Sequence, residues 1–320
     1  MKDKFLNITH ADIDGAACSI LLRKFYGAEN VEIVPIAFSN ADKACTQAIE
    51  KWSDKYKAVF ITDIYPSPEI AAKFDNSNIY MFDHHDSGIP SSKHCTILSN
   101  KEYSAALVVA SKVNGIKNLT KDMKSLVFLT TDYDSYQLTD ERSRQLNLLY
   151  FGKYTFDQYV DRFTDGFDGF TNSEKTYIKG VEKQIVQLKK QVPDKMWCWN
   201  LGGFKVSACT VYDHMNDITD HMFELEPYTD IALVLRIDKR RGSLRLRPTD
   251  KNDIKKDIGF DMQKYVETVI KAQGGGHEFS GGFSWDVKDE FEGIPNFLLD
   301  FRKWNAKLGK DNFYNIKVKV

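Results

Sequence analysis

Short apolar runs alternate with helix-like segments along the first half of the chain. Residues 5–9, 31–38, 57–62 and 79–82 have the length and the β-branched or aromatic content of strands. Helical spacing of apolar residues is found at 16–26, after 38 through 52, at 68–74, and over most of 103–163. This alternation is typical of a parallel, doubly wound α/β sheet.

The pattern changes after residue 171. Charged and polar residues surround apolar positions at helical spacing, which predicts one long helix that Pro193 ends; the apolar positions are Ile178, Val181, Ile185 and Leu188. Further strands are predicted at 204–211, 231–238 and 243–247, with a hairpin turn at 239–242, and a helix at 261–272. We therefore expect a first domain over 1–171, a linker helix over 172–195, and a smaller α/β domain over 196–320.

The composition is that of a globular protein. The chain has 320 residues, of which 42% are hydrophobic and 28% charged, and its net charge of −1 argues against a general coating of nucleic acid. A short or small phosphate substrate fits this charge better. No apolar run reaches the roughly 18 residues of a membrane span, so no membrane partner is expected. The five cysteines form no C-x-x-C pair, which favours reduced thiols and a cytoplasmic location.

Ionisable residues gather directly after the predicted strands. His10-Ala11-Asp12-Ile13-Asp14-Gly15 follows the first strand, Asp63 the third, and Asp83-His84-His85-Asp86 the fourth. Thr131-Asp132-Tyr133-Asp134-Ser135 follows a helical run. The carboxyl ends of parallel strands line one edge of a sheet, where ligands bind, so these residues should meet in space. Gly15 is expected to let the backbone turn sharply.

Several carboxylates at one point repel each other and are stable there when cations neutralise them. Mixed carboxylate and imidazole ligands suit Mn²⁺, with Zn²⁺ or Co²⁺ as alternatives and Mg²⁺ as a less natural one. Two such ions sharing a carboxylate can activate water and hold phosphoryl oxygens. Taken singly, Asp12 could be a helix N-cap and Asp63 an ordinary loop residue. The four segments in this order are much more typical of a metal site than of four unrelated structural roles.

These motifs resemble the DHH phosphoesterases. The resemblance rests on His-x-Asp-x-Asp-Gly, the Asp after a strand, Asp-His-His, and a further Asp. Residues 274–283, Gly-Gly-Gly-His-Glu-Phe-Ser-Gly-Gly-Phe, and the strand 243–247, Ser-Leu-Arg-Leu-Arg, resemble the associated DHHA1 domain. The family includes RecJ-type exonucleases, nanoRNase-type oligoribonucleases, cyclic-dinucleotide phosphodiesterases, 3′-phosphoadenosine-5′-phosphate phosphatases and family II pyrophosphatases.

The resemblance implies a role for each matching residue. One ion would be held by His10, Asp12 and Asp63, and a second by Asp14, Asp63, His84 and Asp134, with Asp132 as the alternative to Asp134. His85 would face the substrate phosphate, and Asp83 would orient a neighbouring imidazole. His10 stands two residues before Asp12, whereas many members of the family have this histidine four residues before the aspartate.

The second domain is expected to bind the far end of the substrate. Arg245 and Arg247 would contact phosphate, and Gly275, Gly276 and His277 would form a glycine-rich turn that admits a phosphate or a base. Phe279, Phe283 and Trp285 would either stack on a base or pack in the core.

These features lead to a functional hypothesis. It is a nanoRNase-like, two-metal exonuclease that degrades short RNA or DNA oligonucleotides to mononucleotides, with a homodimer as one possible assembly. The alternative is a phosphodiesterase or phosphatase of linear or cyclic dinucleotides or of 3′-phosphoadenosine-5′-phosphate. A nucleotide-binding module without activity is the hypothesis from another class, and the intact acidic set argues against it.

Overall fold

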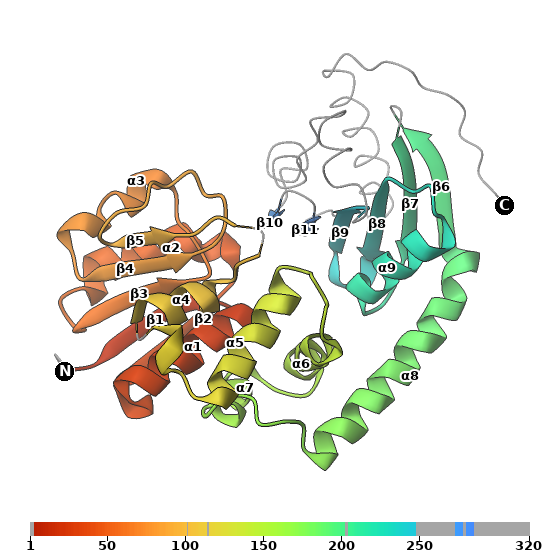
Figure 1. Cartoon of the computed structure of the whole chain (residues 1–320). Coiled ribbons are helices and arrows are strands. Elements are labelled where there is room, and N and C mark those ends of the chain that lie inside the picture. Colours follow the sequence, from red (N-terminus) through yellow and green to blue (C-terminus); the bar gives the residue numbers. More distant parts are fainter. Residues whose placement is uncertain are drawn as a thin grey trace. The chain divides into compact units, whose positions relative to one another are not determined.

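The structure is a computed structural model that describes residues 3–100, 102–113, 115–201, 204–247, 273–277 and 280–284. The chain divides into two compact units, Met1–Val181 and Glu182–Val320 (Figure 1). The division falls inside helix α8 (Asn172–Lys195), which covers the range predicted for the linker helix. None of the helices in the described part is both long and apolar enough to cross a membrane.

Unit 1 is built on a parallel sheet, as predicted. Its described strands are β1 (Phe5–His10), β2 (Val31–Ile36), β3 (Ala58–Thr62), β4 (Ile79–Asp83) and β5 (Cys95–Ile97). Their order is β2-β1-β3-β4-β5, and every neighbouring pair is parallel. β5 was not predicted, because three residues are too few to show a period. The chain reverses its direction of winding between β1 and β3, which is where doubly wound sheets bind ligands.

Helices cover both faces of this sheet (Figure 1). Side chains alternate along β1, so Phe5 packs into one apolar cluster and Leu6 and Ile8 into the other. The first cluster contains residues of α1 (Ile13–Tyr26), α4 (Ala105–Val113), α5 (Lys121–Asp134), α6 (Glu141–Gly152) and α7 (Phe156–Arg162). The second contains residues of α2 (Ala41–Gln47), η3 (Ala48–Trp52) and α3 (Pro68–Ala71).

Helix α1 begins three residues before the predicted start at residue 16. The Asp12 side chain accepts hydrogen bonds from the backbone N–H groups of Asp14 and Gly15, which places Asp14 in the first turn. Gly15 does not serve as a sharp turn, because it lies inside the helix. A Cβ atom at this position would lie 2.0 Å from the carbonyl oxygen of His10, so close backbone packing requires glycine here.

Helix α8 contributes to the core of each unit separately. Ile178 belongs to the first cluster of unit 1, whereas Leu188 and Val192 pack with the buried residues of unit 2. The prediction that Pro193 ends this helix was wrong by two residues, because the helix continues to Lys195. A proline this close to the C-terminal end removes a single N–H donor from the last turns, which the helix tolerates.

The described strands of unit 2 form a six-stranded, mostly antiparallel sheet in the order β10-β11-β9-β8-β7-β6. They are β6 (Met196–Leu201), β7 (Phe204–Thr210), β8 (Ile231–Arg236), β9 (Arg241–Leu246), β10 (Gln273–His277) and β11 (Ser280–Ser284). The predicted hairpin is confirmed as the β8–β9 pair. Helix α9 (Met215–Leu225) and β6 were not predicted, and the helix expected over 261–272 lies outside the described residues.

The glycine-rich segment is a strand and not the predicted turn. Residues 273–277 form β10, in which Gly275 pairs with Gly282 and Gly276 with Gly281 of β11. Glycine lacks a side chain and can adopt extended backbone, so a run of glycines does not by itself exclude a strand.

Candidate metal centre

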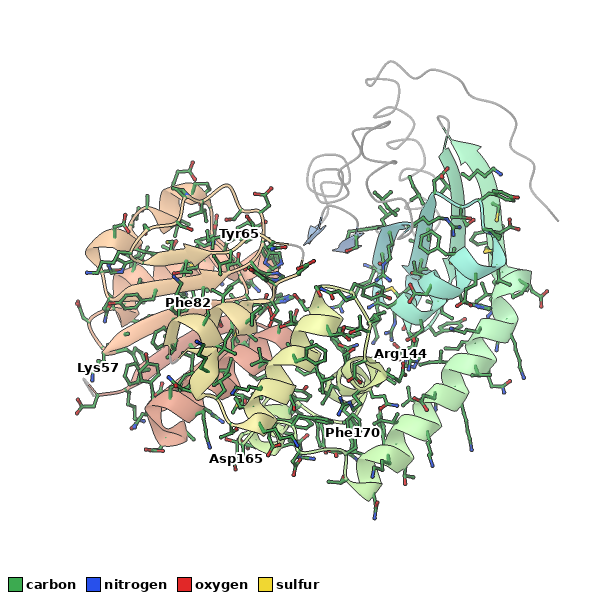
Figure 2. The ribbon with its side chains drawn as sticks, in the orientation of Figure 1. Lys57, Tyr65, Phe82, Arg144, Asp165 and Phe170 are labelled. Carbon is green, nitrogen blue, oxygen red and sulfur yellow. The ribbon has the colours of Figure 1, made fainter. Side chains whose placement is uncertain are left out.

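The carboxyl ends of three neighbouring strands carry the predicted site residues. His10 is the last residue of β1, Asp63 follows β3, and Asp83 is the last residue of β4. Figure 2 shows Lys57 and Tyr65, which flank β3, at its two opposite ends. The sequence prediction that these segments meet at one edge is confirmed by the contacts among their side chains.

His10, Asp12 and Asp63 form a first group of metal-ligand type. Their nearest ligand atoms all lie within 4.8 Å of one another. Nδ1 of His10 is 2.6 Å from Oδ2 of Asp12 and 3.7 Å from Oδ2 of Asp63. Asp12 is also the N-cap of α1, but this role uses Oδ1 and leaves Oδ2 facing His10. The N-cap role of Asp12 therefore leaves one carboxylate oxygen for the predicted metal-ligand role, which stays a prediction.

Asp14, His84 and Asp134 form a second group within the same 4.8 Å limit. Nε2 of His84 lies 3.2 Å from Oδ2 of Asp134 and 3.9 Å from Oδ2 of Asp14. Asp14 is buried, and its two oxygens accept hydrogen bonds from the N–H groups of Ala105 and Ala106 at the start of α4. These bonds at the positive end of that helix favour the charged carboxylate, but burial outweighs them and raises the pKa of Asp14.

Asp63 lies between the two groups. Its Oδ2 faces His10, and its Oδ1 lies 3.7 Å from Nε2 of His84. The residue is 2% exposed and has φ = 58°, in the left-handed region that residues other than glycine rarely adopt. Such a conformation costs on the order of 1–3 kcal/mol and is found mostly at functional sites. The strained backbone of Asp63 thus places its carboxylate between the two groups, with one oxygen toward each.

The electrostatics of the cluster fit divalent cations. Burial, together with the neighbouring carboxylates, raises the pKa of Asp63 and of Asp134 well above their usual range. Burial opposes the charge of His10, but Asp12 and Asp63 outweigh it and raise the pKa of His10 to about 11. Oδ2 of Asp63 and Oδ2 of Asp134 are buried, and neither accepts a hydrogen bond from a described residue. Cations would neutralise these carboxylates and supply partners for both oxygens.

Asp83 and His85 form a hydrogen-bonded pair, and their ligand atoms also lie within 4.8 Å of those of Asp63 and His84. Nδ1 of His85 lies 2.8 Å from Oδ1 of Asp83, which is fully buried. Burial opposes ionisation of Asp83, but His85 and then His84 outweigh it and lower the Asp83 pKa. An ionised Asp83 accepts a hydrogen bond from Nδ1–H of His85, and the ring is thereby oriented with Nε2 pointing away from Asp83. This is the arrangement expected of a carboxylate that orients an imidazole.

The structure separates the two candidates of the fourth motif. Asp134 is the last residue of α5 and lies beside His84, whereas Asp132 is turned toward the start of α6. Asp132 accepts hydrogen bonds from the N–H and hydroxyl groups of Thr139 and from the N–H of Asp140. Asp132 therefore holds the loop after α5, and Asp134 is the member that joins the cluster.

The two predicted arginines of unit 2 are bound within that unit. Arg245 is 8% exposed and donates to Asp220 and Asn216 on α9. Arg247 donates to the carbonyl oxygens of Thr229 and Glu226, each at 2.7 Å. Both guanidinium groups therefore fix α9 and the loop after it. The alternating sequence pattern placed the two arginines on one strand face, but it could not show that α9 covers that face.

Sequence reasoning missed a buried polar network beneath the cluster. The Thr62 hydroxyl lies 3.0 Å from Oδ1 of Asn7 and 2.8 Å from the Thr9 hydroxyl, and Asn7 donates to Ser19 at 2.9 Å. Thr9 in turn donates to the backbone carbonyl oxygen of Gly15. These bonds tie β1, β3 and α1 together directly behind the site. The presence of Asn7, Thr9 and Thr62 in otherwise apolar strands was the sequence signal that could have predicted this network.

No protein-family model and no curated protein sequence matches the chain, but solved structures do. A pGpG-specific phosphodiesterase, PggH from Vibrio cholerae, superposes with a TM-score of 0.55 at 16% identity over 94% of this chain and 99% of its own. The DHH domain of a protein described as a member of a ribosomal protein family gives a TM-score of 0.62 at 14% identity, over 94% and 87% of the two chains.

The exonuclease RecJ bound to manganese gives a TM-score of 0.53 at 11% identity, over 95% of this chain and 90% of the RecJ chain. These matches extend over both units, and at such identities they report on the fold alone. Together with the parallel sheet and the Asp-His-His motif at its carboxyl edge, they show that this chain has the fold of the DHH-domain proteins.

Proposed function

We propose that the chain is a two-metal phosphodiester hydrolase. The observation that carries this proposal is the position of Asp63, with one carboxylate oxygen toward His10 and the other toward His84. His10, Asp12 and Asp63 would hold one divalent ion, and a second would be held by Asp14, Asp63, His84 and Asp134. When bound, the two ions would lower the pKa of water and neutralise charge on the phosphoryl oxygens.

His85 is the proposed group that contacts the reacting phosphate. The hydrogen bond from its Nδ1 to Asp83 fixes the ring, with Nε2 on the other side. In the imidazolium form both ring nitrogens carry hydrogen, so Nε2–H would donate a hydrogen bond to a phosphate oxygen while Nδ1–H donates to Asp83. Asp83 thus acts as a positioning residue for His85.

The proposed substrates are short oligonucleotides, which the enzyme would shorten to mononucleotides. A chain of net charge −1 suits a small phosphate ligand better than a long duplex. Gly275, Gly276 and His277 remain the proposed contacts to the far end of the substrate. We do not assign Arg245 and Arg247 to this role, because both already bind groups of their own unit.

A linear or cyclic dinucleotide is the second candidate substrate. The match to PggH, which is described as specific for pGpG, extends over nearly the full length of both chains, and this favours a dinucleotide. Mn²⁺ is the proposed ion, since it suits mixed imidazole and carboxylate ligands and is bound by the RecJ structure. All five cysteines are free thiols, which fits the proposed cytoplasmic location.

The decisive experiment is a substrate panel. The purified chain would be incubated with Mn²⁺ and 5′-labelled RNAs of increasing length, cyclic dinucleotides and 3′-phosphoadenosine-5′-phosphate, with a chelator as the control. Release of mononucleotides from RNAs of three or more nucleotides supports the oligonucleotide proposal, whereas hydrolysis confined to linear or cyclic dinucleotides supports the dinucleotide one. Tight binding of nucleotides without turnover in any metal would instead identify a binding module.

A further inference from the structure

Two aromatic side chains of unit 1 lie beside the candidate metal centre. Phe38 begins the turn η2 (Phe38–Asn40) after β2, and Tyr65 lies two residues after Asp63. Their ring centroids are 4.8 Å apart at an interplanar angle of 72°, an edge-to-face contact. The Tyr65 centroid is 5.7 Å from that of His85, and the Phe38 centroid is 6.4 Å from it. The pair therefore borders the imidazole proposed to contact the reacting phosphate.

The loops that carry these rings are held in place. Oδ1 of Asp42, at the start of α2, accepts a hydrogen bond of 2.6 Å from the backbone N–H of Ser67. Tyr65 precedes Pro66, which restricts its backbone to extended conformations, and Pro68 fixes the next turn. Figure 2 shows Tyr65 beyond the carboxyl end of β3. Because the loops are already ordered, a planar ligand could bind to these rings at a small cost in loop conformational entropy.

Core packing explains only part of this arrangement. Phe38 and Tyr65 are partly buried against the second apolar cluster of unit 1, so core packing accounts for part of the surface of each ring. Both keep solvent exposure, and both lie at the sheet edge where the ionisable residues converge. Two rings at a large interplanar angle suit a flat partner, which can stack on one ring and present its edge to the other.

We propose that Phe38 and Tyr65 form a stacking subsite for the nucleobase of the nucleotide that carries the reacting phosphate. This inference rests on the proposed function and deepens it. The cluster beside the rings is strongly acidic, so an anionic group without metal would be repelled there, whereas the π face of a base is uncharged and polarisable. Inorganic diphosphate or polyphosphate would gain nothing from the rings. Unit 1 alone would therefore discriminate nucleotides from simple phosphates.

The test measures binding, so that it does not depend on turnover. A non-hydrolysable phosphorothioate dinucleotide and two analogues, each with an abasic sugar at one position, would be titrated into the Mn²⁺-loaded chain. Stacking on an aromatic side chain is worth a factor of roughly 5 to 150 per base. We expect the wild-type chain to bind one of the abasic analogues more weakly than the intact dinucleotide by about this factor.

Variants assign this difference to the rings. Phe38→Leu and Tyr65→Leu keep apolar volume but remove the π face, so each should reduce or remove the discrimination, whereas Tyr65→Phe should preserve it. Phe25→Leu is the matched control, because Phe25 is a partly buried phenylalanine of α1 about 20 Å along the helix from the site. Thermal unfolding and Mn²⁺ content would confirm that each variant is folded and loaded.

The outcomes separate this inference from the proposed function. Equal affinity of the wild-type chain for all three ligands would overturn the stacking subsite, even if the chain hydrolyses phosphodiesters. Unchanged discrimination in both leucine variants would overturn it as well. Discrimination that depends on the rings, in a chain that hydrolyses no phosphodiester, would uphold the subsite and reject the hydrolase.

Discussion

Nε2 of His84 lies 3.7 Å from Oδ1 of Asp63, while the other carboxylate oxygen of Asp63 lies 3.7 Å from Nδ1 of His10. One side chain thus faces both groups of the candidate metal centre. Asp63→Ala should release both ions, whereas loss of His10 should weaken chiefly one. Because changes to residues that merely support metal ligands cost 10- to 100-fold, we expect a loss above roughly 100-fold in kcat for Asp63→Ala.

The measurement is bound Mn²⁺ per chain, together with turnover of a short oligonucleotide. Asp157→Ala offers a matched control, since Asp157 is an exposed aspartate in the first turn of α7, outside the metal groups. A fully loaded Asp63→Ala chain would show that this residue is not shared between two ions.

Asp132 and Asp134 should respond differently to removal of their charge. Asp134→Asn should lower Mn²⁺ affinity, because Asp134 lies 3.2 Å from His84 within the cluster. Asp132→Ala should instead destabilise the fold by about 1–3 kcal/mol, since three hydrogen bonds from Thr139 and Asp140 lose their acceptor. Urea unfolding and metal titration of both variants distinguish the two roles. Loss of Mn²⁺ affinity in Asp132→Ala and loss of stability alone in Asp134→Asn would make Asp132 the metal ligand.

Asp83→Asn should reduce catalysis without removing metal. An asparagine can still accept the hydrogen bond from Nδ1 of His85, but it no longer supplies the negative charge that strengthens this bond and holds the ring in place. We expect kcat to fall about 10- to 100-fold with Mn²⁺ content unchanged. If Asp83→Asn loses metal as well, Asp83 is itself a ligand, which its proximity to Asp63 and His84 also permits.

The chelated, metal-free chain should lose stability as pH rises. A group whose folded pKa is raised binds its proton more tightly in the folded chain, so its stabilising contribution is complete below the unfolded pKa and lost as pH rises through the folded value. For His10 this contribution is lost between pH 6.5 and about 11, and the raised pKa values of Asp63 and Asp134 act in the same direction.

Urea unfolding across this range, in chelator and in excess Mn²⁺, gives the comparison. Bound Mn²⁺ should reverse the trend, because it binds the deprotonated ligands and stabilises the folded chain. Asp63→Asn should flatten the slope in chelator. A metal-free chain that gains stability with pH over the same interval would contradict the proposed charge repulsion.

Arg247→Ala tests whether this residue serves the fold or the substrate. Its guanidinium donates to the carbonyl oxygens of Thr229 and Glu226, so removal should lower the free energy of unfolding by about 1–3 kcal/mol. Lys205→Ala is a charge-matched control on a neighbouring exposed surface. Unchanged stability with a raised KM for dinucleotides would restore the substrate-binding role expected from the sequence.

The sequence by itself determined the parallel sheet of unit 1 and the gathering of most residues of the candidate metal centre. Strands β1, β3 and β4 are mostly apolar, and the ionisable residues stand at or directly after their carboxyl ends. A residue at the carboxyl end of a parallel strand must lie at one edge of the sheet, so local pattern was enough to bring His10, Asp63 and His84 together.

Only the tertiary structure showed which of two neighbouring aspartates joins the cluster and which side chains from distant segments contact each other. Asp132 and Asp134 differ by two positions on one helix, and their roles depend on where α5 ends and on how the loop before α6 folds back. Arg245 binds α9 rather than solvent because that helix packs on β8 and β9. The contact of Phe38 with Tyr65 joins residues 27 positions apart through two loops. Loops show no regular spacing of apolar residues from which their conformation could be predicted. Contacts between side chains so far apart in sequence depend on three-dimensional packing, which the sequence pattern does not contain.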